Sequence, residues 1–191
     1  LNMIQYLSHE KIDGDKAIEH SMINADLKSV ETLLASDAIM LDYVSVGTCA
    51  VKYKLVEIIT KLIEMDPSLI EEMLLASYLT NSVKLFKYIY TLGNASQEEK
   101  DNIMTIKTFK KASHAAVNKI TRFLLEMGAN PATNDNKPII NACKSGNAEL
   151  VHILLQYQSV DPSAQNNTSI IEASHRGYAD IVRMLLNDTR V

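Results

Sequence analysis

The histidines are the side chains of this sequence best suited to acid–base or metal chemistry, because imidazole titrates near neutral pH and binds metal ions in its neutral form. They are scattered along the chain, at His9, His20, His114, His152 and His175. His114 and His175 occupy nearly equivalent positions in two similar segments, which would place them on the same face of two short helices. We favour ordinary surface histidines over a metal or acid–base role for this pair.

Two further groups of charged residues could bind an ion, and neither fits the pattern that its ligand requires. Asp13 and Asp15 flank Gly14 as at the start of a calcium loop, but Asn24 stands at the twelfth position, where such a loop needs Glu. Five lysines could form a basic strip for phosphate groups, yet acidic residues lie just before three of them; the lysines are Lys84, Lys87, Lys107, Lys110 and Lys111, and the acids are Glu98, Glu99 and Asp101. We predict a solvated turn and a mixed-charge surface.

Motifs of common catalytic and cofactor sites do not occur in the sequence. It has no Cys-x-x-Cys, no His-Glu-x-x-His, no phosphate-cradling glycine loop and no nucleophile elbow. Cys49 and Cys143 are far apart, so we expect buried free thiols and a reducing compartment. The net charge of -4 gives no nucleic-acid footprint, and no apolar run approaches the roughly 18 residues of a membrane span. We predict no catalytic, cofactor or metal site, and no nucleic-acid, membrane or small-molecule partner.

The last third of the chain contains the same pattern twice. Segments 130–160 and 161–191 coincide at an offset of 31 in their prolines, glycines and apolar residues. In each, an apolar-spaced run ends at a glycine, Gly146 or Gly177, where a left-handed residue can end a helix. After each glycine four apolar residues share one helical face. A fixed period in this range indicates a solenoid, here of antiparallel helix pairs joined by polar hairpin loops.

The residues at the ends of these units resemble the ankyrin-repeat family. The run Ile120 to Pro131 resembles its apolar helix end followed by Gly-Ala-Asn and a turn, and Lys137-Pro138-Ile139-Ile140 stands where the family usually has Thr-Pro-Leu-His. The hydrogen-bonding Thr and His are missing, which implies repeats that stack less rigidly. The divergent repeats resemble arrays common in giant viruses and protists. The resemblance implies an all-α solenoid of helix-turn-helix repeats with hairpin loops, less regular in the N-terminal half.

The same template, moved along the chain, predicts a single array over residues 1–191. We expect one helix to run straight into the next repeat at Asp66-Pro67, and a turn at Ala116. Both ends interrupt a repeat, which predicts a fragment of a longer array. The predicted units are a partial repeat at 1–15, repeats at about 16–37, 38–66 and 67–94, an insertion at 95–107, and repeats at 108–129, 130–160 and 161–191.

In proteins that resemble this one, the ligand lies in a concave groove and contacts the hairpin tips and the first helices. Projected onto this chain, the hairpin tips are Asn134, Asp135, Gln165 and Asn166. Tyrosine and arginine on such a surface are enriched at interface hot spots, although Tyr53 and Tyr78 could equally pack between repeats. The predicted groove residues are Tyr53, Tyr78, Leu79, His114, Lys144, Asn147, His175, Arg176 and Tyr178.

The resemblance implies a non-catalytic protein-binding module, a scaffold or substrate adaptor, whose partner is another protein. A second hypothesis is the targeting arm of a larger enzyme, of a ubiquitin-ligase adaptor or of a secreted effector. A third is a structural element that assembles end to end through its repeats. We expect an intracellular, cytoplasmic protein, and for a viral protein the host cytoplasm.

Overall fold

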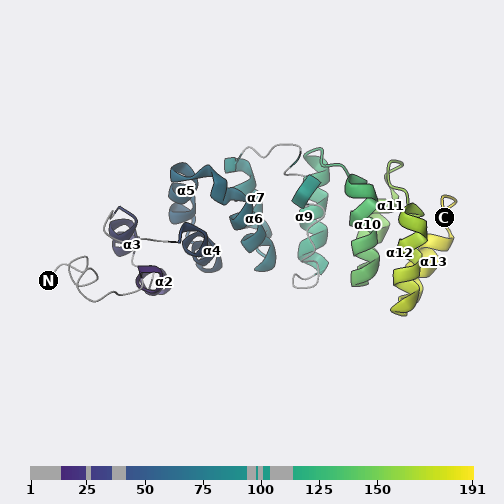
Figure 1. Cartoon of the computed structure of the whole chain (residues 1–191), viewed down its shortest axis with the longest axis horizontal. Helices are drawn as coiled ribbons and strands as arrows, with labels where there is room; N and C mark the ends of the chain where they lie inside the picture. Colours follow the sequence, from purple (N-terminus) through teal and green to yellow (C-terminus); the bar gives the residue numbers. More distant parts are fainter. Residues whose placement is uncertain (1–13, 25–26, 36–41, 94–97, 99–100, 104–113) are drawn as a thin grey trace. The chain divides into compact units, whose positions relative to one another are not determined.

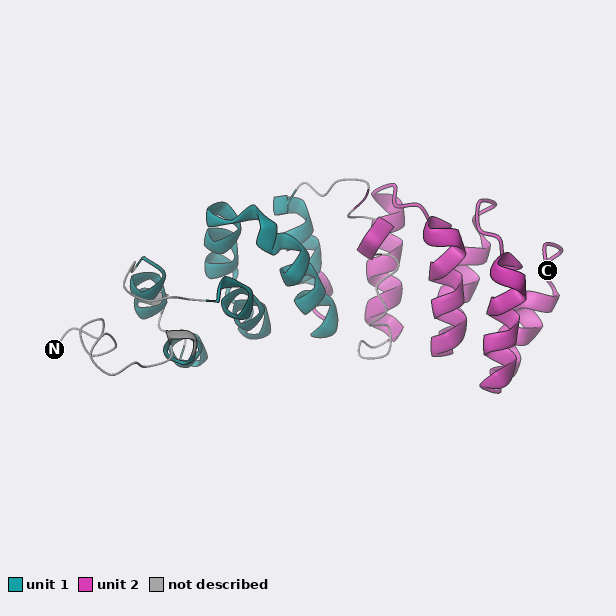
Figure 2. Cartoon of the chain, in the orientation of Figure 1, with its two compact units in different colours: residues 1–80, 84–94 teal, residues 81–83, 95–191 magenta. Residues whose placement is uncertain are grey.

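The computed structural model describes residues 14–24, 27–35, 42–93, 98, 101–103 and 114–191, and this part of the chain is helical without any strand. The all-α, helix-turn-helix prediction is confirmed. The chain forms two compact units, unit 1 with residues 1–80 and 84–94 and unit 2 with residues 81–83 and 95–191 (Figure 2). Most of the predicted partial repeat 1–15 and of the insertion 95–107 lies outside the described residues.

Unit 1 is built from pairs of helices in which each first helix packs on the next first helix, α2 on α4 and α4 on α6 (Figure 1). Each pair lies within one of the predicted repeats, except that α2 begins two residues earlier than expected. The helices are α2 (Gly14–Ile23), α3 (Leu27–Leu34), α4 (Tyr43–Tyr53), α5 (Val56–Met65), the short 3₁₀ helix η1 (Pro67–Leu69), α6 (Ile70–Leu79) and α7 (Val83–Gly93).

The starts of two helices in unit 1 are set by aspartates. Asp42 accepts a hydrogen bond from the backbone N–H of Val44 at 3.1 Å, so α4 begins at Tyr43. Asp66 likewise accepts from Ser68 at 3.0 Å, and Pro67 stands in the first turn of η1. Because η1 leads directly into α6, no hairpin separates these repeats. The expected continuous helix is interrupted, because α5 ends at Met65 and Asp66 is extended.

Unit 2 stacks helix pairs in the same way, with α10 on α12 and with α11 between α9 and α13. The turn predicted at Ala116 is wrong, because Ala116 is buried inside α9 and the chain is helical on both sides of it. Residues 108–113, with which the predicted repeat 108–129 begins, lie outside the described residues. The helices are α9 (His114–Glu126), α10 (Thr133–Ser145), α11 (Ala148–Leu155), α12 (Ala164–His175) and α13 (Ala179–Leu186).

The turn between the two helices of a pair has a residue in the left-handed conformation at the same position in both units. Gly146 and Gly177 have φ of 74° and 73°, as their sequence pattern predicts. At the corresponding positions of the earlier pairs stand Lys54, with φ of 58°, and Asn81, with φ of 57°. The left-handed conformation therefore also occurs where another residue replaces glycine, although a side chain in this region costs energy.

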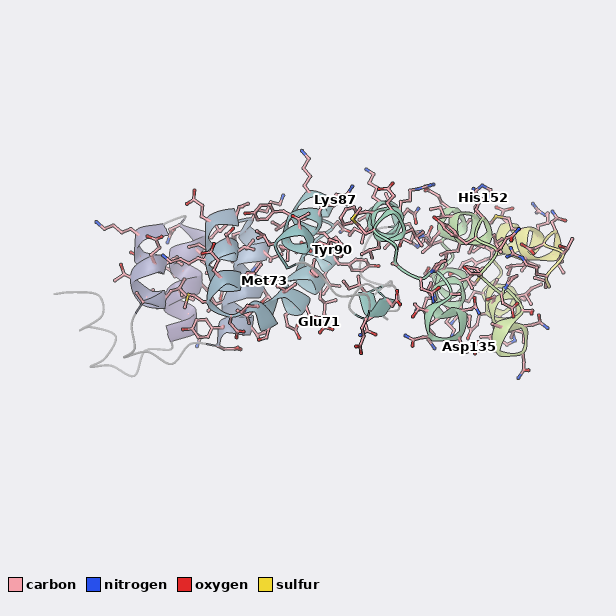
Figure 3. All side chains as sticks on the ribbon, turned by 90° about the horizontal axis from the view of Figure 1, so that it is seen from above. Glu71, Met73, Lys87, Tyr90, Asp135 and His152 are labelled. Atoms are coloured by element: carbon pink, nitrogen blue, oxygen red, sulfur yellow. The ribbon has the colours of Figure 1, made fainter. Side chains whose placement is uncertain are left out.

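The apolar faces of the paired helices form the core of each unit. Figure 3 shows Met73, which is 1% exposed, between Glu71 on one edge of unit 1 and Lys87 on the other. In unit 2, Asp135 and His152 lie on opposite edges in the same figure.

Among the described residues, no helix is long and apolar enough to cross a membrane.

Candidate functional site

A groove in unit 1 crosses the first helices of three successive pairs, and we call it the first-helix groove. Its volume is about 570 Å³, and α2, α4 and α6 each contribute side chains to its lining. Ligand sites in proteins have volumes of roughly 300 to 1,000 Å³. The groove is therefore large enough to hold several side chains of a bound molecule.

The wall that α6 contributes is apolar at Leu75, Ala76 and Leu79, and it carries Glu72 and Thr80 at its two ends. Leu75 and Leu79 are one helical turn apart, so they project from the same face of α6, and Ala76 lies beside them. All three are half-buried. The adjoining helix α4 approaches closely at Gly47, where a Cβ would lie 2.6 Å from the terminal methyl carbon of Met73. A larger residue than glycine at this position would force the end of the Met73 side chain to move.

The lining from α2 and α4 includes charged side chains. Lys52 Nζ lies 3.8 Å from Glu19 Oε1, and 5.0 Å from the centre of the Tyr53 ring. Hydrogen bonding to Tyr53 and the charge of Glu19 raise the pKa of Lys52, so its ammonium group stays charged. Burial and the charge of Glu19 raise the pKa of the Cys49 thiol, and Lys52 only partly opposes them. Cys49 is therefore held as a neutral thiol in the lining, and not as a nucleophile.

In unit 2 the first helices carry a charged cluster. Glu172 of α12 pairs with Lys144 Nζ of α10 at 3.1 Å and with Arg176 one turn along its own helix. Burial raises the pKa of Glu172, but the hydrogen bonds and charges of its two cationic partners outweigh it, so the pKa is lowered. Two predicted groove residues, Lys144 and Arg176, thus share one carboxylate.

The predicted hairpin tips lie in turns made of consecutive left-handed residues. Asn134, Asp135 and Asn136 have φ of 50°, 54° and 60°, and residues 165–167 repeat this pattern. Asn and Asp tolerate this region better than most residues. The two turns are also connected, because Asn136 Oδ1 accepts from the backbone N–H of Asp161 at 2.7 Å and Gln165 Nε2 donates to Asp135 O at 3.0 Å. The four predicted tips, Asn134, Asp135, Gln165 and Asn166, are all exposed.

The structure places some of the predicted groove residues where a partner could not reach them. Tyr78 and Asn147 are only 4% and 2% exposed, so the expectation that these side chains face a groove does not fit their burial. Burial also raises the pKa of Tyr78. Leu79 lines the first-helix groove and Tyr53 lies half-buried beside Lys52.

The remaining predicted residues lie at the surface of unit 2. His175 and Arg176 are exposed, and the half-buried Tyr178 covers Gly146. His114 is exposed but is the first residue of α9, which packs on the second helix α11, whereas His175 ends the first helix α12. The predicted equivalence of the two histidines is therefore wrong. Among the described residues, no three His, Cys, Asp or Glu side chains are grouped as a metal site would require.

Asn147 has a structural role that the sequence pattern did not indicate. Its Nδ2 donates to Asn118 Oδ1 at 2.7 Å, and Asn118 Nδ2 donates to Glu149 Oε2 at 2.7 Å. Asn147 Oδ1 also accepts from the backbone N–H of Leu150 at 3.2 Å, which caps α11. The network joins α9 to α11, and supplies polar links between repeats that lack the usual Thr and His. Two asparagines 29 residues apart, close to the repeat length, were the signal that could have revealed it.

Arg190 is a second residue that the sequence did not single out. Its guanidinium group donates to the carbonyl oxygens of Leu155, Tyr157 and Val160 at 2.8 to 3.1 Å. Asp188 holds it in place by accepting two hydrogen bonds from the guanidinium group. These bonds lower the pKa of the Asp188 carboxyl group, although its partial burial acts in the opposite direction. Arg190 therefore satisfies the carbonyl groups at the end of α11 and after it.

Comparison with protein families gives a match over residues 110–191, to the model described as ankyrin repeats (3 copies). No curated protein and no solved structure matches the chain. The matched segment contains the charged cluster, the left-handed turns and the asparagine network, whereas the first-helix groove lies outside it.

Proposed function

Residues 110–191 are ankyrin repeats, and from this premise we propose that the chain is a non-catalytic scaffold or adaptor that holds a partner protein in the first-helix groove of unit 1. Ankyrin repeats are generally protein–protein interaction modules and typically lack catalysis. The observation that carries the proposal is the groove itself, with apolar side chains from α6 half-exposed between three first helices. Binding is favoured when a partner removes apolar surface of this kind from water.

The exposed turns of unit 2 support a second set of contacts. Asn134, Asp135, Gln165 and Asn166 carry exposed amide or carboxylate groups on a backbone fixed by hydrogen bonds between neighbouring turns. A fixed backbone loses little conformational entropy when a partner binds. We therefore include these turns in the proposed binding surface.

Site-specific photo-crosslinking tests the proposal. A photoreactive amino acid replaces Leu79 in the groove, or His152 on the second helix α11 as the control, and captured proteins are identified by mass spectrometry. We expect partners captured at position 79 and not at position 152, and lost when Leu75→Asp is added to the same chain. Circular dichroism and thermal melting must show that each variant is folded. Equal capture at both positions would contradict the groove assignment.

A specific observation also favours end-to-end self-assembly as a second candidate. Ile171 of α12 and Leu186 of α13 are 46% and 64% exposed, on the helices of the last repeat. Sedimentation of the chain over a range of concentrations tests this candidate, with Leu186→Asp as the matched variant. Concentration-dependent association that the substitution abolishes would support assembly, and a monomer at all concentrations would remove it.

A further inference from the structure

We infer that the first-helix groove takes an amphipathic segment of the partner polypeptide, with an aliphatic or aromatic side chain against Leu75, Ala76 and Leu79 and a carboxylate at Lys52. The inference rests on the proposed function and adds the chemistry of the partner to it. It follows from the composition of the lining of the groove.

The apolar wall determines the first requirement. Leu75 and Leu79 come from one face of α6, and neither is covered fully by the protein. Ala76 adds its methyl group to this apolar stretch, and the polar side chains that α6 adds to the lining, Glu72 and Thr80, lie before and after it. A side chain that fits this wall must be apolar and large enough to contact two leucines one turn apart.

Lys52 determines the second requirement. Its side chain is 59% exposed, and it pairs with the carboxylate of Glu19 at 3.8 Å, the long end of the range for an ion pair. Glu19 is itself 47% exposed, so solvent screens this pair strongly. A partner carboxylate that contacts Lys52 Nζ at hydrogen-bonding distance, with water excluded by the apolar wall, would make a stronger interaction.

A polypeptide fits this lining better than a nucleic acid does. The charged residues of the lining are two lysines and two glutamates, Lys16, Lys52, Glu19 and Glu72, so their charges cancel. Nucleic-acid binding requires a surplus of basic groups along the phosphate path. A short peptide segment can offer both a carboxylate and an apolar side chain, the two groups that this lining accommodates.

Selection from a random peptide library displayed on phage tests the inference with the whole 191-residue chain as bait. We expect the wild-type chain to enrich peptides that combine Leu, Met or Phe with Asp or Glu. Lys52→Glu should enrich peptides that combine the same apolar residues with Lys or Arg, and Leu79→Asp should enrich neither. Lys61→Glu, which reverses a lysine of the second helix α5 outside the lining, is the matched control and should select the wild-type sequences.

Fluorescence anisotropy with a selected acidic–apolar peptide gives the size of the effect. Lys52→Glu should weaken its binding about tenfold or more, and changing the peptide acid to Lys should restore binding to this variant. Failure to enrich peptides, or the same consensus from every variant, would overturn the inference. If position 79 still captures a whole protein by photo-crosslinking, only this inference fails, whereas the loss of both results removes the proposed function as well.

Discussion

The last two repeats of unit 2 have nearly the same sequence pattern but different neighbours, and this difference decides what their equivalent residues do. Ile140 and Ile171 are 31 positions apart, yet Ile140 is 0% exposed and Ile171 is 46% exposed. The first lies in α10, on which α12 packs, and the second lies in α12, on its outer side. Burial in a stacked array thus depends on the neighbouring repeat as much as on the residue itself.

The largest expected effect comes from a charge at these two positions. Ile140→Asp should lower the free energy of unfolding by more than about 3 kcal/mol, because it buries an unpaired carboxylate. Ile171→Asp should change it by less than about 0.5 kcal/mol, because water reaches the new group. The midpoints of urea unfolding measure both.

Leu154 and Leu185 provide the control for this pair. Both are 0% exposed, so Leu154→Asp and Leu185→Asp should each lower the free energy of unfolding as strongly as Ile140→Asp does. An equally severe Ile171→Asp would show that something covers this face in solution, and would support the self-assembly candidate.

The next effect separates Gly146 from Gly177. Both are left-handed, so Ala at either position should cost about 1 kcal/mol. A Cβ at Gly177 meets no atom within 4 Å, whereas at Gly146 it would lie 2.7 Å from the ring of Tyr178. Gly146→Ala should therefore cost about 1 to 3 kcal/mol more than Gly177→Ala in thermal or urea unfolding. In a Tyr178→Ala background the two substitutions should cost the same, and a persisting difference would exclude the ring as its cause.

These positions also show how far the sequence predicts the fold. The two glycine turns of unit 2 could be predicted because glycine is the residue that the left-handed region favours. Lys54 and Asn81 adopt the same conformation without that signal, and Ala116, at the matching position, does not, because it is buried within α9. Local propensity is a weak guide when tertiary packing determines the turn.

The candidate site was predictable in outline and not in detail. The first helices were expected to line a groove, and Leu79 and Lys52 do so. The burial of Tyr78 and Asn147 depends on helix orientation and on a side-chain partner 29 residues away, which periodicity alone does not determine. Arg190 acts on carbonyl groups about 30 residues upstream, a contact that only the folded chain brings together.

A smaller effect extends the comparison of turns to unit 1. Lys54→Gly should raise the free energy of unfolding, by up to about 1 kcal/mol, because glycine has no side-chain penalty at a φ of 58°. Thermal unfolding measures the change, and Lys61→Gly inside α5 is the contrasting variant. That substitution should destabilise the chain by about 1 kcal/mol, because it places glycine in a helix interior. A Lys54→Gly chain no more stable than the wild type would mean that the lysine side chain compensates for its conformation.

The smallest effect concerns Glu172, whose equivalent in the preceding repeat is the buried Asn141. The folded chain holds the pKa of Glu172 below its ordinary value of 4.5, so ionised Glu172 stabilises the folded state at pH above that value. The contribution is lost as the pH falls through 4.5 towards the folded pKa. We expect Glu172→Gln to lower the free energy of unfolding at pH 7 by less than about 1 kcal/mol and to reduce its decline in acid. Asp180→Asn, at an ion pair whose side chains are 73% and 81% exposed, is the control. If Glu172→Gln leaves the acid limb of the stability curve unchanged, the bonds from Lys144 and Arg176 do not persist in solution, and both cations are available to a partner.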